Sequence, residues 1–325
     1  MIWTAEEFRN YVESHKAEFI GMAFLLFISS MGLNHINENK GKVVIPKSTY
    51  SETPLKRWKR LTEASDFAQL GDIGTIEVDS YLAQFRDVYF PTELERMYKG
   101  EMRKKGQDPH DFPFSEWFTQ EAAKAIAQQM ERTVWQAKVD TGGDAAADIY
   151  DGILEQTKAA ITAGTLTPVA LGTPVQQKSK DQEFLAGEIG IINLVEQLYD
   201  NLPEAIKMRG VKIWLSPALM TMYSRSYRDV YRDGVTIDPD LNRPVLDSTN
   251  SYAPAVFHPC PGMGDSQRII IAETDNLYYT YDVEDDATKI TTEKHFNGLY
   301  MFSDVRIGSG ILQPEDAWMT CNELV

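Results

Sequence analysis

The spacing of apolar residues predicts helices near the start of the chain. Thr4 and Glu7 have the spacing of a capping box, and the apolar residues after them recur on one helical face. A second helix is predicted from about residue 17 to residue 32, with so few polar residues that another surface must cover it. A charged surface helix is predicted over residues 92–105, where Gly106 ends the pattern.

Short β-prone pieces fill the segment between these helices. Residues 43–45 and 75–78 are rich in β-branched side chains, and prolines and glycines separate the two pieces. This pattern predicts a long projecting hairpin or loop. The aromatic and apolar residues of segment 81–90 then predict a strand.

The longest amphipathic pattern predicts a helix that is the main structural strut. It begins at Ser115, which can cap a helix, and continues to about residue 140. Gly142 and Gly143 follow, and we expect these two glycines to supply the positive φ that a helix end often uses.

The second half of the chain alternates helices and strands. Helices are predicted over residues 150–163 and 189–208, the second interrupted or kinked near Pro203. A buried strand, 211–215, runs into a helix that continues through Tyr231. Helix, strand and helix in succession predict an α/β core. The remainder is β-rich, with strands predicted over residues 269–272, 277–282, 289–296 and 300–307.

The composition is that of an ordered globular chain. Hydrophobic residues make up 43% of the 325 residues, which suits one large mixed domain or two closely joined ones. Cys260 and Cys321 are the only cysteines and lie in unlike contexts, so neither a disulfide framework nor a four-ligand zinc site is indicated. The longest apolar run near the N-terminus, 19–31, is shorter than a membrane span and follows acidic residues. Neither a membrane helix nor a secretory signal is predicted.

Charge is unevenly distributed along the chain. The formal net charge of -16 disfavours a dedicated nucleic-acid reader, because affinity for a phosphate backbone comes from lysine and arginine. The segment from Glu38 to Arg60 is the exception, with seven bases and two acids. Trp58 lies among its bases, which are Lys40, Lys42, Lys47, Lys56, Arg57, Lys59 and Arg60. A basic arm therefore precedes an acidic body.

No motif in the sequence assembles a catalytic site. Asp140-Thr141-Gly142 copies the tripeptide of aspartic proteases, but no second copy supplies the partner carboxylate, so we interpret it as a helix end. The segment Gly262 to Gln267 begins like a dinucleotide loop but lacks the last glycine, and we interpret it as a turn. His258-Pro259-Cys260 offers two soft ligands without a second pair nearby. We therefore predict no enzyme activity, no cofactor and no metal.

A run of acidic residues near the end of the chain has three interpretations. It consists of Glu273, Asp275, Asp282, Glu284, Asp285 and Asp286, with no base between them. One interpretation is a calcium loop, although the spacing does not fit an EF-hand. Another is a solvated face with turns. The third is an acidic rim that receives the basic arm of an identical neighbour and sets its register.

The order of the predicted elements and several stretches of sequence resemble the major capsid proteins of tailed bacteriophages. The likeness covers nearly the whole chain, and within that family it is greatest to phages of Bacteroidetes-type hosts. The stretches that carry it are Lys40-Gly-Lys-Val-Val-Ile-Pro46, residues 76–94, Asp151-Gly-Ile-Leu-Glu-Gln156 with Thr167-Pro168, Lys212-Ile-Trp-Leu-Ser-Pro217 and residues 269–281.

The resemblance implies the Hong Kong ninety-seven fold, an α+β class with an N-arm, an extended E-loop, a peripheral domain with a long spine helix, and an axial α/β domain. The implied ranges are 1–36 for the N-arm, 37–80 for the E-loop, 81–184 for the peripheral domain with its spine helix at about 115–140, 185–282 for the axial domain, and 283–325 for the return to the peripheral domain.

The resemblance also implies a function. The chain would self-assemble as hexamers and pentamers into an icosahedral phage head, part of a virion assembled in the bacterial host cytoplasm. Portal, scaffold and decoration proteins are the further partners, and double-stranded DNA is enclosed without sequence-specific binding. We expect noncovalent assembly, no proteolytic maturation of this subunit, and a scaffold encoded separately. The alternatives that stay open are an encapsulin-like cellular nanocompartment, another virion structural protein, and an enzyme whose site the sequence does not reveal.

Overall fold

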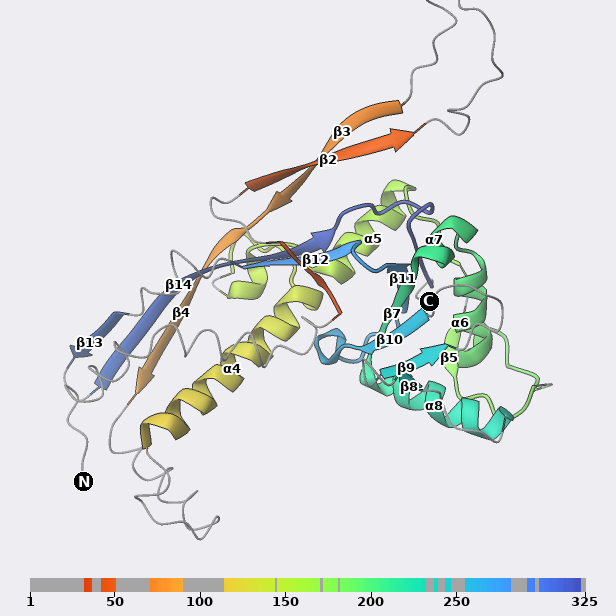
Figure 1. Cartoon of the computed structure of the whole chain (residues 1–325). Coiled ribbons are helices and arrows are strands. Elements are labelled where there is room, and N and C mark those ends of the chain that lie inside the picture. Colours follow the sequence, from red (N-terminus) through yellow and green to blue (C-terminus); the bar gives the residue numbers. More distant parts are fainter. Residues whose placement is uncertain are drawn as a thin grey trace, which may run out of the picture.

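The computed structural model describes residues 32–36, 42–50, 71–89, 114–143, 145–169, 172–180, 182–231, 237–238, 243–246, 255–281, 291–295 and 298–322 (Figure 1). The two N-terminal helices and the surface helix predicted from the sequence lie outside these residues. So do ten of the predicted interface residues, namely Lys40, Lys56, Arg57, Trp58, Lys59, Arg60, Asp282, Glu284, Asp285 and Asp286.

A five-stranded sheet is built around one long strand, β14 (Gly298–Ile311). One edge of β14 pairs antiparallel with the whole of β4 (Tyr81–Tyr89). The other edge pairs in succession with β13 (Thr291–His295) and β12 (Leu277–Tyr281), both antiparallel. A short parallel strand, β1 (Asn34–Ile36), adds to β12. Segments from both ends of the chain therefore meet in one sheet.

A two-stranded ladder stands away from this sheet (Figure 1). It consists of β2 (Lys42–Tyr50) and β3 (Gly71–Asp79), which pair antiparallel along their whole length. Both strands are longer than the β-prone pieces that predicted them. β3 continues through Ser80 directly into β4, so one extended run of chain joins the ladder to the five-stranded sheet.

A six-stranded sheet forms the second layer of the protein, with the order β15-β11-β7-β10-β9-β8. Only β7 and β10 are parallel, and the other neighbours are antiparallel. The strands are β7 (Val211–Leu215), β8 (Ile237–Asp238), β9 (Arg243–Leu246), β10 (Ala255–Pro259), β11 (Ile270–Glu273) and β15 (Met319–Cys321).

Three helices cover one face of the six-stranded sheet: α6 (Ile191–Asp200), α7 (Glu204–Arg209) and α8 (Pro217–Tyr231). The predicted interruption at Pro203 is confirmed, because this proline precedes the first residue of α7 and lacks the amide hydrogen that would continue α6. The start and end predicted for α8 are also confirmed. Leucines and isoleucines of α6 pack here against alternate residues of β7 and β10.

The opposite face of the six-stranded sheet packs against the five-stranded sheet and two further helices. Because side chains alternate along a strand, Ile213 of β7 points into the helix-covered core while Trp214 points into this second core. Trp135, Ile153 and Leu277 meet Trp214 there, from three different elements. This shared core holds the two sheets together.

The long helix α4 (Phe114–Gln136) confirms the predicted strut but ends earlier than expected. The prediction that Gly142 and Gly143 end it with positive φ is wrong, since neither belongs to the positive-φ glycines of the described residues. The chain leaves the helix because the amide of Lys138 pairs with the carbonyl of Ala147 instead of a helical partner. Asp140 then accepts a hydrogen bond of 2.9 Å from the amide of Gly142, which closes a separate turn.

The helix α5 (Ile153–Ala163) ends as predicted at Gly164, which has φ +75. The predicted turn at Gly262 is confirmed as a short 3-10 helix, η4, followed by Gly264 with φ +57. The remaining short elements are η3 (Ala146–Asp148), η4 (Pro261–Met263), and the parallel pair β5 (Thr173–Val175) and β6 (Glu188–Gly190).

Sheet membership crosses the domain ranges that the resemblance implies. β12 falls within the expected axial range, 185–282, but belongs to the five-stranded sheet with β4 and β14. β15 falls within the expected peripheral return, 283–325, but pairs with β11 in the six-stranded sheet. The chain therefore crosses between the two sheets both after β11 and before β15.

Candidate functional site

The described part of the predicted basic arm is the ladder of β2 and β3. Lys42 pairs with Asp79 at its root and Lys47 pairs with Gly74 farther out. Val44, between them, leaves 54% of its surface exposed. A two-stranded ladder buries little apolar surface on its own, so this arm presents an apolar side chain to whatever covers it.

The root of the arm is tightly fitted to the five-stranded sheet. A Cβ on Gly308 of β14 would stand 2.5 Å from the carbonyl oxygen of Asp79, so only glycine admits the chain as it passes from β3 to β4. Directly after this crossing, Tyr81 stacks on Tyr150 with ring centroids 5.5 Å apart. Leu82 next to it is 56% exposed. The root is thus fixed while apolar side chains on both sides of it stay uncovered.

Glu273 and Asp275 are the described members of the predicted acidic rim. Asp275 is exposed, but Glu273 forms an ion pair of 3.3 Å with Arg209 of α7. The guanidinium of Arg209 also lies 5.7 Å from the ring centroid of Trp318. Glu273 is therefore bound within its own subunit and is a poor receptor for a neighbour's basic arm.

A hydrogen-bonded junction joins α4 to the six-stranded sheet, and the sequence did not reveal it. The amide of Gly262 in η4 donates a hydrogen bond of 3.1 Å to the buried carboxylate of Glu131, and its carbonyl accepts one from the side-chain amide of Gln136. A Cβ on Gly262 would stand 1.9 Å from the carbonyl oxygen of Glu131. Glycine is required here because the backbones of helix and turn are in direct contact.

The helix α5 is tied to the same junction. The side-chain amide of Gln156 donates 2.8 Å to the carbonyl of Ser309 and accepts 3.2 Å from the amide of Ile311, both in β14. The hydroxyl of Ser309 donates 2.9 Å to the carbonyl of Val134 in α4. Both helices are thereby bonded to the central strand of the five-stranded sheet.

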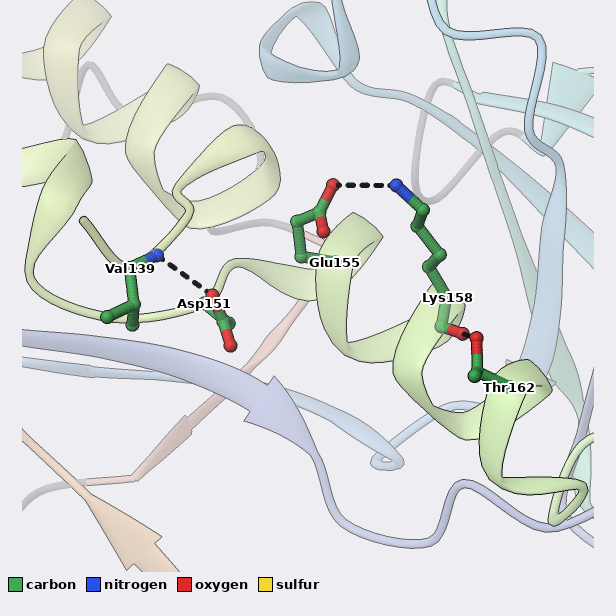
Figure 2. A network of polar contacts seen from close by, with 5 residues as sticks. All are labelled: Val139, Asp151, Glu155, Lys158 and Thr162. Carbon is green, nitrogen blue, oxygen red and sulfur yellow. Dashed lines mark hydrogen bonds and ion pairs between the residues drawn. The ribbon is translucent and has the colours of Figure 1, made fainter.

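The outer side of α5 carries its own polar contacts, drawn in Figure 2. Asp151 accepts a hydrogen bond of 2.9 Å from the amide of Val139, which fixes the chain between the two helices. Glu155 and Lys158 form an exposed ion pair of 3.6 Å, and Thr162 bonds back to the carbonyl of Lys158. An exposed pair of this kind contributes little to stability.

Asn276 ties together the two crossings between the sheets. It is buried, and it lies between β11 and β12. Its side chain donates 3.0 Å to the carbonyl of Gln313 and accepts 2.8 Å from the amide of the same residue, which follows β14. The carbonyl of Asn276 accepts a further 2.9 Å bond from Leu312.

The N-terminal segment enters the body through a tight site. The side chain of Lys212 donates 3.2 Å to the carbonyl of Gly32. A Cβ on Gly32 would stand 2.8 Å from the His258 ring and 3.1 Å from the Trp214 indole nitrogen. His258 and Trp214 are both buried. The chain that precedes β1 is therefore anchored at the core shared by the two sheets.

Cys260 and Cys321 are both free and buried. Burial raises the pKa of the Cys321 thiol, which makes it less reactive at neutral pH. Among the described residues, no three histidine, cysteine or acidic side chains come together in a way that could hold a metal ion. The part of the chain that the structure describes also has no helix long and apolar enough to span a membrane.

Comparison with solved structures identifies the fold. A chain of the satellite phage P4 procapsid with its size determination protein has a TM-score of 0.56, 11% sequence identity, and covers 94% of this chain and 89% of its own length. The fold is that of phage capsid proteins. The capsid of an empty GTA particle gives a TM-score of 0.54 at 11% identity, with 92% of this chain and 90% of its own covered.

The capsid fold confirms the coarse fold expected from the resemblance. No family model matches the sequence, and a comparison with curated proteins found no match. The likeness therefore concerns three-dimensional structure. The host type, the domain ranges and the interface residues stay predictions.

Proposed function

We propose that this chain is the shell protein of a phage head, which self-assembles as hexamers and pentamers around double-stranded DNA. The observation that carries this proposal is the capsid fold, shared over more than nine tenths of the chain with two shell structures. Its location would be the virion, and portal, scaffold and decoration proteins would be its further partners.

The arm supports the proposal with a physical reason for assembly. The ladder of β2 and β3 pairs with no other strand of the described residues and exposes Val44, and Leu82 beyond its root is exposed as well. Contact with an identical neighbour would cover such side chains, and subunits that meet head to tail can each cover the next one around a closed ring. Many modest contacts then add up because the subunits are linked into one assembly.

Electron microscopy of the purified protein tests the proposal. Closed shells built of hexamers and pentamers are the expected result, whereas tubes, isolated rings or persistent monomers contradict it. Particles expressed with the other phage components should protect DNA from nuclease. Protein cargo in place of DNA would instead favour a cellular compartment.

A shortened arm provides a matched variant. Val44 and Glu77 lie opposite one another in the ladder, so replacing residues 45–76 by Asn-Gly closes the remaining strands with a two-residue hairpin turn. This variant should keep the circular dichroism spectrum of a folded protein and fail to form shells. Normal shells from it would contradict a role for the arm in assembly.

A further inference from the structure

The two most exposed large hydrophobic side chains of the described residues lie at opposite ends of α6. Leu185 is 73% exposed and precedes the helix, whereas Met208 is 66% exposed and lies in α7, which follows the helix. Because α6 has ten residues, its length separates the two ends by about 15 Å. Figure 1 shows α7 at one end of α6 and β5, the partner strand of the chain entering α6, toward the other.

The surroundings of the two residues carry opposite charges. Glu183 and Glu188 flank Leu185, and they are the only charged residues between positions 182 and 190. Lys207 and Arg209 flank Met208 and are the basic residues of the last turn of α7. One end of α6 therefore presents an apolar side chain among acids, and the other presents one among bases.

Both surfaces are held in place within the subunit. The amide of Glu188 donates 2.9 Å to the carbonyl of Leu185, and Gly187 between them has φ +86, so Leu185 lies on a fixed turn. Lys207 donates 2.9 Å to the carbonyl of Asp200, and Arg209 is fixed by its ion pair with Glu273. Surfaces that are already ordered lose less entropy when they bind.

We infer that these surfaces bind each other between copies of this chain, with Leu185 of one subunit against Met208 of the next. The contact is head to tail, because it uses two different surfaces of the subunit, and such contacts close into rings. The inference rests on the proposed function, since a ring is the building unit of the shell, and it names the side chains that set the direction of the ring.

Single substitutions at each surface test the contact. Leu185→Asp and Met208→Asp should each raise the subunit concentration needed for assembly by about tenfold, measured by light scattering, because a buried apolar side chain contributes about that much per contact. Val139→Asp is the matched control, since Val139 is also apolar and 49% exposed but lies at neither surface. Circular dichroism should show that all three variants are folded.

A charge pair placed across the contact makes the test specific. Met208→Glu alone should impair assembly, and adding Leu185→Lys should restore at least part of it, more at low salt than at high salt. Equal assembly of wild type, L185D and M208D, equal impairment of the Val139 control, or no restoration by the pair overturns the inference. If the wild type forms shells and the variants also do, only this inference fails. If the wild type forms none, the proposed function fails.

Discussion

The amide of Gly262 donates a hydrogen bond of 3.1 Å to a carboxylate oxygen of Glu131, and this bond joins the long helix α4 to the six-stranded sheet. The two residues are 131 positions apart in the sequence. Glu131 is only 7% exposed, so water does not readily replace the bond if one partner is removed.

Replacing Glu131 should therefore destabilise the protein in a graded way. Glu131→Ala leaves the buried amide of Gly262 without an acceptor and should lower the free energy of unfolding by about 1–3 kcal/mol. Glu131→Gln keeps an acceptor oxygen and should cost less. Urea unfolding measures both, and equal stability of the two variants would contradict this role of the carboxylate.

Two glycine substitutions separate steric contact from backbone strain. Gly262→Ala places a Cβ 1.9 Å from a backbone oxygen of α4, and should cost about 3 kcal/mol or more because helix and turn must separate. Gly164→Ala meets no atom within 4 Å but has φ +75, and should cost only about 1 kcal/mol. Thermal unfolding of both variants should show this order, and the reverse order would mean that α4 and η4 are not in direct contact.

Asn276 offers a third test of the connection between the sheets. Asn276→Ala removes two hydrogen bonds to Gln313 and leaves its buried backbone groups unpaired, so we expect a loss of about 2 kcal/mol in urea unfolding. The control is Asp275→Ala, an exposed neighbour that should change stability by less than about 0.5 kcal/mol. A similar effect of both would place the stabilisation elsewhere in this turn.

Alkaline pH should destabilise the protein through two buried tyrosines. Burial raises the pKa of Tyr150 and of Tyr223 above the ordinary value. Their contribution to stability is therefore complete below about pH 10 and is lost as the pH rises further, because only the unfolded chain then ionises them. The loss approaches about 1.4 kcal/mol per pH unit for each tyrosine.

Phenylalanine variants assign this pH dependence. Tyr150→Phe and Tyr223→Phe should each flatten the fall in stability above about pH 10, since phenylalanine does not ionise. Urea unfolding at pH 7 and at several alkaline values measures the slope. An unchanged slope in both variants would assign the alkaline loss to other groups.

Local signals in the sequence predicted those elements whose ends are set by nearby residues. Ser216 and Pro217 gave the start of α8, and Gly164 gave the end of α5, because a cap or a left-handed glycine acts on its own helix. The strands of the C-terminal part were also predicted close to their observed positions. In each of these elements, residue type and local geometry agree.

The junctions depend on partners that are distant in the sequence, and no local pattern could reveal them. Gly262 lies against α4 because of the tertiary fold, and Arg209 reaches Glu273 from another element. The error at Gly142 has the same origin, since the chain after α4 bonds to residues around Ala147 instead of forming a glycine cap. A glycine whose backbone is in contact with a helix looks the same in sequence as one in an open turn.

Ser80 lies where the arm meets the body, with an unbroken strand on each side of it. An extended chain resists stretching far more than it resists bending. A pull on the far end of the ladder would therefore pass along β3 into β4, and from there into the hydrogen bonds that join β4 to β14 in shear. Such bonds share the load along the whole strand, so the arm can hold a neighbour under tension without being peeled from its own subunit.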